Sequence, residues 1–180
     1  EPENMKQAGV KQIVMIGLAL AVALQFLLLT GMVITSAFPL VSGKEIRVKT
    51  MPVDPRSLFR GNYARLGYEF SSIPEDKLPP GVKIRTGEVI YLMLAPDPHE
   101  SDGNFYRFDR AVLDRPDTGI FLRGRAMNNY GTIRVRCGIE AFFAPKEKAL
   151  ALERELREGA VAVLMVASSG RARIREIIAQ

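Results

Sequence analysis

The sequence is poor in the residues that build metal and redox sites. It has one cysteine, Cys137, and one histidine, His99, among 180 residues. A single cysteine cannot form an internal disulfide, and its place in an alternating apolar pattern predicts a buried small side chain. His99 stands among proline, aspartate and serine, with no second histidine or cysteine to share a metal ion. The sequence therefore predicts no metal site and no cofactor, and it leaves the redox compartment open.

A recognisable catalytic set is also missing, as are internal repeats, low-complexity tracts and nucleic-acid-binding motifs. Met51-Pro52 followed by Gly61 is faintly similar to signal peptidases, which need a serine activated by a nearby lysine. Residues 105–143 contain no lysine, so this pattern does not assemble the pair. We expect a protein that is not an enzyme and binds no nucleic acid. The alternative is a serine-type, signal-peptidase-like hydrolase, whose candidate nucleophiles are Ser36, Ser42 and Ser57.

Charged residues are absent from 13–38, a run of mostly apolar side chains. At about 1.5 Å per residue, a helix of this length crosses a hydrocarbon core about 30 Å thick. The sequence predicts a polar tail over residues 1–11, a transmembrane helix over 12–38 that ends at Pro39, and one domain over 43–180. A cleavable signal peptide has an apolar run of only about 7–15 residues, so we expect the helix to remain as an anchor in the lipid bilayer.

The short tail sets the expected orientation. It carries Lys6 and Lys11, and positive charge beside a span favours the cytoplasmic side, whereas a long domain crosses largely regardless of its charge. We therefore expect the tail inside and the domain outside. Within the span, Gly17, Ala21 and Gln25 form one stripe that would suit contact with a partner helix or a second copy of the chain. The alternative is that small residues are simply common in such helices.

The domain has the alternating pattern of β-strands and one helical segment. A mainly β (α+β) fold is predicted, with a compact antiparallel sheet structure, loops over 71–81 and 96–104, and a helix after Pro145. The run Val89–Ala95 is apolar throughout and predicts a central strand covered on both faces. The other predicted strands are 45–49, 63–70, 105–113, 120–126, 132–140, 161–167 and 171–178.

Arginine dominates the charge of the domain. Residues 43–180 contain 23 Lys and Arg, of which 17 are Arg, against 18 Asp and Glu. A hairpin loop at 128–131 would place Arg123 opposite Arg136 and Arg125 opposite Arg134, and like charges so placed are destabilising. Either Glu140 or Asp109 neutralises them, or they bind an anionic partner or a lipid headgroup. Three further arginines could widen this face: Arg171, Arg173 and Arg175.

A nine-residue segment suggests a family. Arg60-Gly61-Asn62-Tyr63-Ala64-Arg65-Leu66-Gly67-Tyr68, after Pro52-Val53-Asp54-Pro55-Arg56, resembles the membrane-anchored proteins named for the G-D-Y-x-x-L-x-Y motif. Gly138-Ile139-Glu140, Phe142-Phe143 with Pro145, and Gly170-Arg171-Ala172 agree with it. The resemblance implies a bacterial protein with one N-terminal anchor in the cytoplasmic membrane, an outward periplasmic domain and an association with multi-span membrane proteins. The resemblance leaves the activity of the family unknown.

Asn62 departs from the motif, which has aspartate there. A turn accepts either residue, whereas a catalytic or metal-binding carboxylate would be lost. We therefore interpret the motif as architecture, a tight turn leading into a strand with Tyr63 and Tyr68 on opposite faces. The positions that we assign to this structural role are Asp54, Arg56, Arg60, Gly61, Asn62, Tyr63, Leu66, Tyr68, Gly138 and Glu140.

The features together favour a membrane-anchored extracytoplasmic module that binds or stabilises other envelope or multi-span membrane proteins. The hydrolase described above is one alternative. A domain that binds a small ligand or a lipid headgroup is another, and it would have a deep apolar pocket near Tyr63 or Tyr68.

Overall fold

The structure is a computed structural model of the chain, and it describes residues 2–51, 63–74, 77–78, 81, 84–100, 103–129, 132–143 and 159–179. The helix predicted after Pro145 lies outside these residues. By its internal contacts the chain divides into two units, Glu1–Phe38 and Pro39–Gln180.

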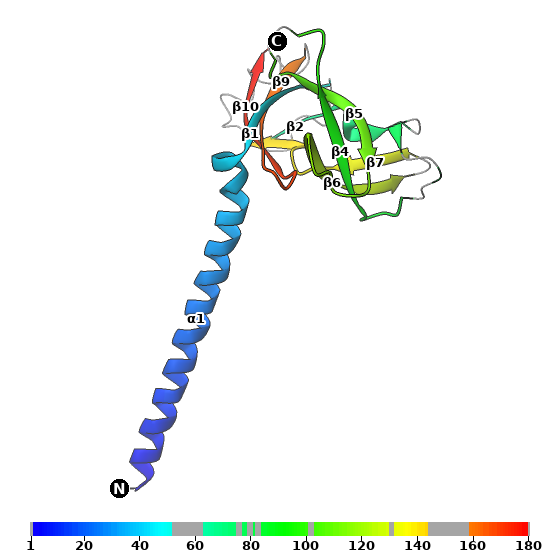
Figure 1. Ribbon diagram of the computed structural model, residues 1–180. Helices are drawn as coiled ribbons and strands as arrows, with labels where there is room; N and C mark the ends of the chain where they lie inside the picture. Colours follow the sequence, from blue (N-terminus) through cyan, green and yellow to red (C-terminus); the bar gives the residue numbers. More distant parts are fainter. Residues whose placement is uncertain are drawn as a thin grey trace. The chain divides into compact units, whose positions relative to one another are not determined.

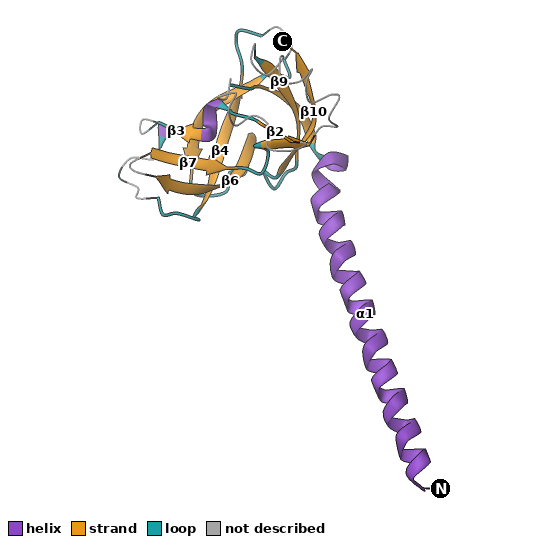
Figure 2. Ribbon diagram, turned by 180° about the vertical axis from the view of Figure 1, so that it is seen from behind, coloured by secondary structure: helices purple, strands orange, loops and turns teal. Residues whose placement is uncertain are grey.

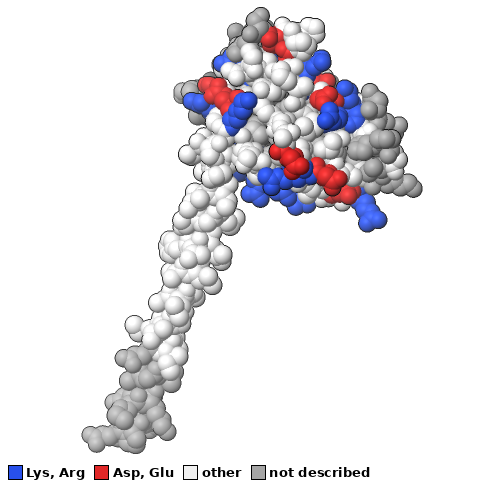
Figure 3. All heavy atoms as spheres, in the orientation of Figure 1, with Lys and Arg blue, Asp and Glu red and all other residues white. Residues whose placement is uncertain are grey.

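The first element is the long helix α1 (Pro2–Ser42). Its segment Ile13–Ser42 is long and apolar enough to cross a membrane. The side chains described on α1, those of residues 13–42, include no charged ones, and the face seen in Figure 3 is uncharged over this length. The expected end at Pro39 is wrong, because the helix continues to Ser42 and the Pro39 carbonyl oxygen accepts a hydrogen bond from the Gly43 amide at 2.9 Å. A proline removes one amide donor but leaves its own carbonyl able to complete the final turn.

The strands within the described residues form three antiparallel sheets (Figures 1 and 2). A three-stranded sheet has the order β1 (Lys44–Lys49), β9 (Ala160–Val166), β10 (Ala172–Ala179). A short ribbon pairs β2 (Tyr63–Arg65) with β8 (Ala141–Phe143). The five-stranded sheet has the order β3 (Ser72–Ile73), β7 (Thr132–Arg136), β6 (Ile120–Asn129), β4 (Val89–Pro96), β5 (Tyr106–Val112).

Backbone contacts join the sheets around one core. Arg47 of β1 forms a bridge with Phe105, next to β5. The Arg123 amide of β6 donates to the Gly170 carbonyl oxygen, in the turn between β9 and β10, at 2.7 Å. Ile46, Leu122 and other buried residues of the sheets belong to a single hydrophobic cluster. The mainly β fold with one long N-terminal helix is therefore confirmed.

Two predicted strands are wrong in their extent. The segment 63–70 has strand structure only in β2 and then turns through the 3₁₀ helix η2 (Glu69–Ser71), although Leu66, Tyr68 and Phe70 are buried as the alternation required. The segment 132–140 leaves the sheet after Arg136, because Gly138 has a φ of 83° and turns the chain toward β8. The predicted loop over 71–81 contains β3.

Candidate functional site

The outer face of the five-stranded sheet is rich in arginine. Even-numbered residues of β4 and β6, such as Ile90, Leu92 and Leu122, point into the core. Their odd-numbered neighbours lie on the other face of the sheet, where Phe121 is buried and the other described residues are partly or fully exposed. Strand pairing then places six arginines on the outer face, five of them exposed and Arg123 half-buried. We call this set the arginine face: Arg107, Arg110, Arg123, Arg125, Arg134 and Arg136.

The register of the β6–β7 hairpin differs from the predicted one by two residues. Arg125 lies opposite Arg136, while Arg134 lies opposite Met127 and Arg123 opposite Tyr91 of β4. The predicted pairs are wrong because pairing begins at Asn129 and Thr132, which leaves a two-residue connection instead of a four-residue loop. A shift of two residues keeps every side chain on its face, so the predicted arginines still lie together.

Few described carboxylates compensate this charge. Asp109 accepts from Arg110 at 2.7 Å, and Nη1 of Arg125 donates to the Gly87 carbonyl oxygen at 2.9 Å. The Glu140 carboxylate instead accepts from the backbone amides of Cys137 and Gly138. The expected neutralisation by Glu140 is therefore wrong, and that by Asp109 is limited to Arg110.

The sequence reasoning missed Arg107 and Arg110, which β5 contributes through its pairing with Ala95 and Met93. Pairing of the predicted strands 89–95 and 105–113 would have found them. Arg173, expected to widen the arginine face, lies instead on β10 opposite Met165 in the three-stranded sheet.

Of the three arginines expected there, Arg171 follows the turn residue Gly170, and Arg175 forms an ion pair with Glu45 at 2.7 Å. Neither belongs to the five-stranded sheet.

Two pieces of the recognised motif meet in the core. Tyr68 is 2% exposed, its hydroxyl donates to the carbonyl oxygen of Ile139 at 2.9 Å, and its amide donates to Ser71 Oγ at 3.0 Å. The amide of Leu66 donates to the Glu140 carbonyl oxygen at 2.9 Å. The carbonyl oxygens of Ile139 and Glu140 that accept two of these bonds lie in the segment that turns at Gly138. The described part of the motif is therefore a structural junction.

The environment of this junction suppresses ionisation. Burial raises the pKa of the Tyr68 phenol, and the charges of Glu140 and Cys137 raise it further. Burial also raises the pKa of the Cys137 thiol, again with a contribution from Glu140. Cys137 as a residue is partly exposed, but its sulfur is turned inward. A thiol with a raised pKa is a poor nucleophile, which agrees with the structural role expected for Cys137.

The remaining motif positions, Asp54, Arg56, Arg60, Gly61 and Asn62, lie outside the described residues, and Tyr63 is described only by its backbone in β2. The predicted roles of these six positions, including opposite faces for Tyr63 and Tyr68, stay predictions.

Two of the three candidate serine nucleophiles lie among the described residues. Ser36 and Ser42 lie in the last turns of α1, and Ser57 is outside the described residues. Lys44 and Lys49, the lysines that follow in sequence, contact Tyr106 and Glu100. Over the described ranges, no three His, Cys, Asp or Glu side chains gather where a metal could bind. The hydrolase alternative is not tested by these observations.

On α1, Gly17, Ala21 and Gln25 are exposed along the helix. A side chain added at Gly17 would meet no atom within 4 Å. The stripe is therefore accessible to another helix, and its use as a contact stays a prediction.

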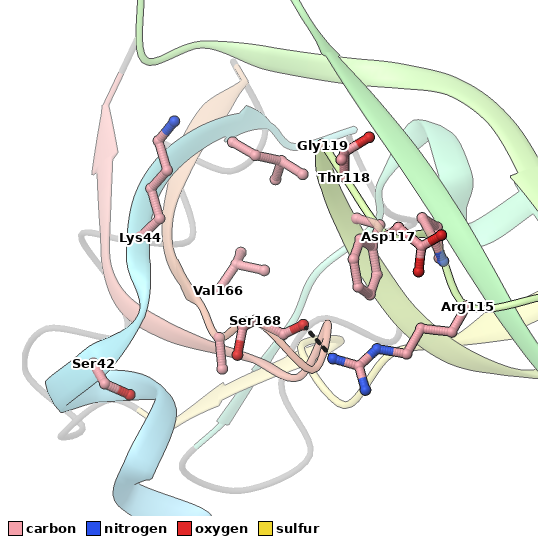
Figure 4. A pocket seen from close by; sticks show the side chains of 12 residues that line it. Ser42, Lys44, Arg115, Asp117, Thr118, Gly119, Val166 and Ser168 are labelled. Carbon is pink, nitrogen blue, oxygen red and sulfur yellow. Dashed lines mark hydrogen bonds between the residues drawn. The ribbon is translucent and has the colours of Figure 1, made fainter.

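A cavity lies away from the expected position near Tyr68. It has a volume of about 620 Å³ and opens at the end of the three-stranded sheet (Figure 4). Its lining comes from the β1 and β9 ends and from the segment before β6: Ser42, Lys44, Arg115, Pro116, Asp117, Thr118, Gly119, Ile120, Phe121, Val166, Ala167 and Ser168.

The chain matches a protein-family model. The family model described as GDYXXLXY protein matches residues 25–177, which include most of the apolar helix and nearly all of the domain. No curated protein and no solved structure matches the chain.

Proposed function

The chain belongs to the GDYXXLXY family, and we propose that it is a membrane-anchored, non-catalytic module that binds an acidic surface of another envelope protein through its arginine face. The observation that carries the proposal is the direct opposition of Arg125 and Arg136 on the exposed side of the five-stranded sheet. Like charges placed directly opposite each other destabilise a sheet, and the described carboxylates compensate little of this repulsion. Binding of an acidic partner would reduce the repulsion.

The composition of the arginine face suits protein recognition. Guanidinium groups bind carboxylates through two parallel hydrogen bonds. Between them lie partly or fully exposed apolar side chains, namely Val89, Tyr91, Met93 and Met127. Arginine, tyrosine and methionine are enriched at protein interfaces, where they combine charge with a large contact area. An acidic protein surface with apolar patches is therefore the partner that this face fits best.

Anchoring would bring the domain to such a partner. In the proposal α1 crosses the cytoplasmic membrane once, with the tail that carries Lys6 and Lys11 in the cytoplasm and the domain outside. Confinement to the same membrane raises the effective concentration of a membrane-protein partner. The stripe of Gly17, Ala21 and Gln25 would add a helix–helix contact with that partner or with a second copy of the chain.

The first test uses the full chain in mild detergent and immobilised polyglutamate as a defined acidic probe. Replacement of Arg125 and Arg136 by glutamine should weaken binding about tenfold at low salt. The matched control removes the same charge from β10 of the three-stranded sheet through Arg173→Gln and Arg175→Gln, and it should bind like the parent chain. Equal losses in both variants would mean that net charge, not the arginine face, determines binding.

The second test identifies the class of partner in cells. A photo-crosslinking amino acid at Met127, on the arginine face, should capture a membrane or envelope protein, and the Arg125→Gln/Arg136→Gln variant should abolish the product. The same amino acid at Met165, on the other sheet, serves as the control. Crosslinks to lipid alone, or equal crosslinks at both positions, would contradict the proposal.

A further inference from the structure

The cavity at the end of the three-stranded sheet combines cations with an apolar wall. Its volume of about 620 Å³ is that of a typical ligand site. Lys44 and Arg115 are its cationic residues, and Asp117 is the one acidic residue of the lining. Ile120, Phe121 and Val166 supply apolar surface. A site with this composition favours an anionic amphiphile over a purely polar or purely apolar molecule.

Lys44 lines this space from the start of β1. Lys44 pairs with Val166, whose side chain is buried, and it lies on the same face of β1 as Ile46, two residues further along, with its own side chain exposed at the end of the sheet. Its Nζ atom lies 3.5 Å from the hydroxyl of Tyr106 and 5.8 Å from the centre of that ring. This weak contact leaves the ammonium group able to take a stronger anionic acceptor.

Arg115 lies on the opposite side of the cavity, as Figure 4 shows. Its Nη2 atom donates to the carbonyl oxygen of Ser168 at 3.2 Å (dashed line in Figure 4). A guanidinium group has five donors, so a ligand oxygen can be bound without loss of this bond. The two cations thus flank one opening from two different segments of the chain.

The position of the cavity along the chain indicates the source of the ligand. Its lining begins at Ser42, the last residue of α1, and Lys44 is two residues further, a separation of at most about 7 Å. Ile13–Ser42 contains 30 residues and would be about 45 Å long, close to the thickness of a bilayer including its headgroups. If α1 spans, as the proposed function requires, these residues lie at headgroup depth.

We propose that the cavity binds the phosphate-bearing headgroup of an anionic phospholipid from the leaflet that contains the C-terminal end of α1. Lys44 and Arg115 bind the phosphate. Ile120, Phe121 and Val166 contact the glycerol and the first methylene groups. The site differs from the arginine face, which lies on the outer side of the five-stranded sheet and is proposed to bind protein.

The experiment uses the purified full chain in non-ionic detergent. It is titrated with short-chain phosphatidylglycerol, with short-chain phosphatidylcholine and with inorganic phosphate, and binding is followed by calorimetry and by the rise in Tm. We expect saturable binding of phosphatidylglycerol, at least about tenfold tighter than that of the other two probes. Equal affinity for phosphatidylcholine, or equal affinity for inorganic phosphate, would overturn the assignment to an anionic lipid.

Variants locate the binding. Lys44→Gln/Arg115→Gln should weaken phosphatidylglycerol binding at least about tenfold, while Arg125→Gln/Arg136→Gln removes the same charge elsewhere and should bind normally. If the first variant does not fold, Thr118→Trp fills the cavity without removing a cation, and it should abolish binding. Unchanged affinity in the folded cavity variants would overturn the proposal.

Anchoring is measured separately, by retention of the intact chain in carbonate-washed membranes. A chain that washes off would contradict the proposed function, whereas a retained chain that binds no phosphatidylglycerol would contradict only the lipid site. The two failures are therefore distinguishable.

Discussion

The hydroxyl of Tyr68 donates a hydrogen bond to the carbonyl oxygen of Ile139 over 2.9 Å, in a position where Tyr68 is 2% exposed. This bond joins the last residue of the L-x-Y element to the turn at Gly138 and Glu140. The Tyr68 ring also stacks on Phe70, with centroids 5.0 Å apart. One side chain therefore fixes both the backbone of the turn and part of the core.

The first prediction removes this bond. Tyr68→Phe keeps the ring but leaves the buried carbonyl of Ile139 without its donor, so we expect the free energy of unfolding to fall by about 1–3 kcal/mol. Denaturant unfolding of the full chain in detergent measures it. Tyr91→Phe is the control, because the Tyr91 ring keeps its edge contact with Phe121 at 5.7 Å. Equal effects of the two substitutions would mean that the hydroxyl of Tyr68 contributes little.

The second prediction concerns alkaline stability. The folded state raises the pKa of Cys137 and of Tyr68 above their ordinary values of 9.0 and 10.0. Above about pH 9 the unfolded chain therefore releases protons that the folded chain retains, so stability falls with rising pH, by up to about 1.4 kcal/mol per pH unit for each group. Below pH 8 these groups give no slope.

Unfolding curves between pH 7 and pH 10, recorded with a reducing agent, test this expectation. Cys137→Ala should flatten the slope that begins near pH 9, because it removes the first group to ionise. An unchanged slope in Cys137→Ala would show that other groups determine the alkaline transition.

The alternation of apolar and polar residues predicted which strand residues face the core. The residues of the β6–β7 connection did not determine the register of that hairpin. Side chains in a strand have a period of two, so the inward positions of Ile46 and Val48 could be read from the alternation in β1. The run Val89–Ala95 is apolar throughout, and the prediction that both of its faces are covered is wrong, because its odd-numbered residues are partly exposed. The opposition of Arg125 and Arg136 depends on whether the hairpin connection has two or four residues, and Asn, Tyr and Gly are compatible with both. Four of the six arginines of this face were thus predicted to lie together, while their pairs were not.

The cavity could not be predicted from sequence. Lys44 and Arg115 are far apart along the chain and belong to segments with no shared periodicity. They approach the same opening because β1 pairs with β9 and because the turn at Gly170 bonds to β6. The approach of two residues so distant in sequence depends on the packing of the three sheets, and a local sequence pattern does not determine that packing.

The third prediction uses the close approach of β6 and β7. A Cβ atom at Gly124 would collide with Val135 Cγ1 and lie 3.0 Å from Cys137 Sγ. Val135 is 3% exposed, so its side chain has little room to move. Gly124→Ala should therefore destabilise the chain by about 1–3 kcal/mol in the same unfolding assay.

Gly103→Ala is the matched control for that substitution. A Cβ atom there would meet no atom within 4 Å, so we expect a change within about 0.5 kcal/mol. A Gly124→Ala variant as stable as Gly103→Ala would contradict the packing of the β6–β7 pair.

The last prediction separates stability from binding on the arginine face. Arg136→Glu places a carboxylate directly opposite Arg125 and replaces a repulsive pair with an attractive one. We expect the free energy of unfolding to rise by about 0.5–1 kcal/mol at low salt and the gain to shrink at high salt, while binding to polyglutamate weakens.

Arg134→Glu makes the same charge change on the same strand, but it faces Met127 and Ser72, so its stability gain should be smaller. A substitution that stabilises the fold and abolishes binding would indicate that the repulsive pair is maintained for recognition, since folding alone favours its removal. Equal stability gains in the two variants would instead point to net charge as the cause, and no gain in Arg136→Glu would mean that the pair is already neutralised within the folded chain.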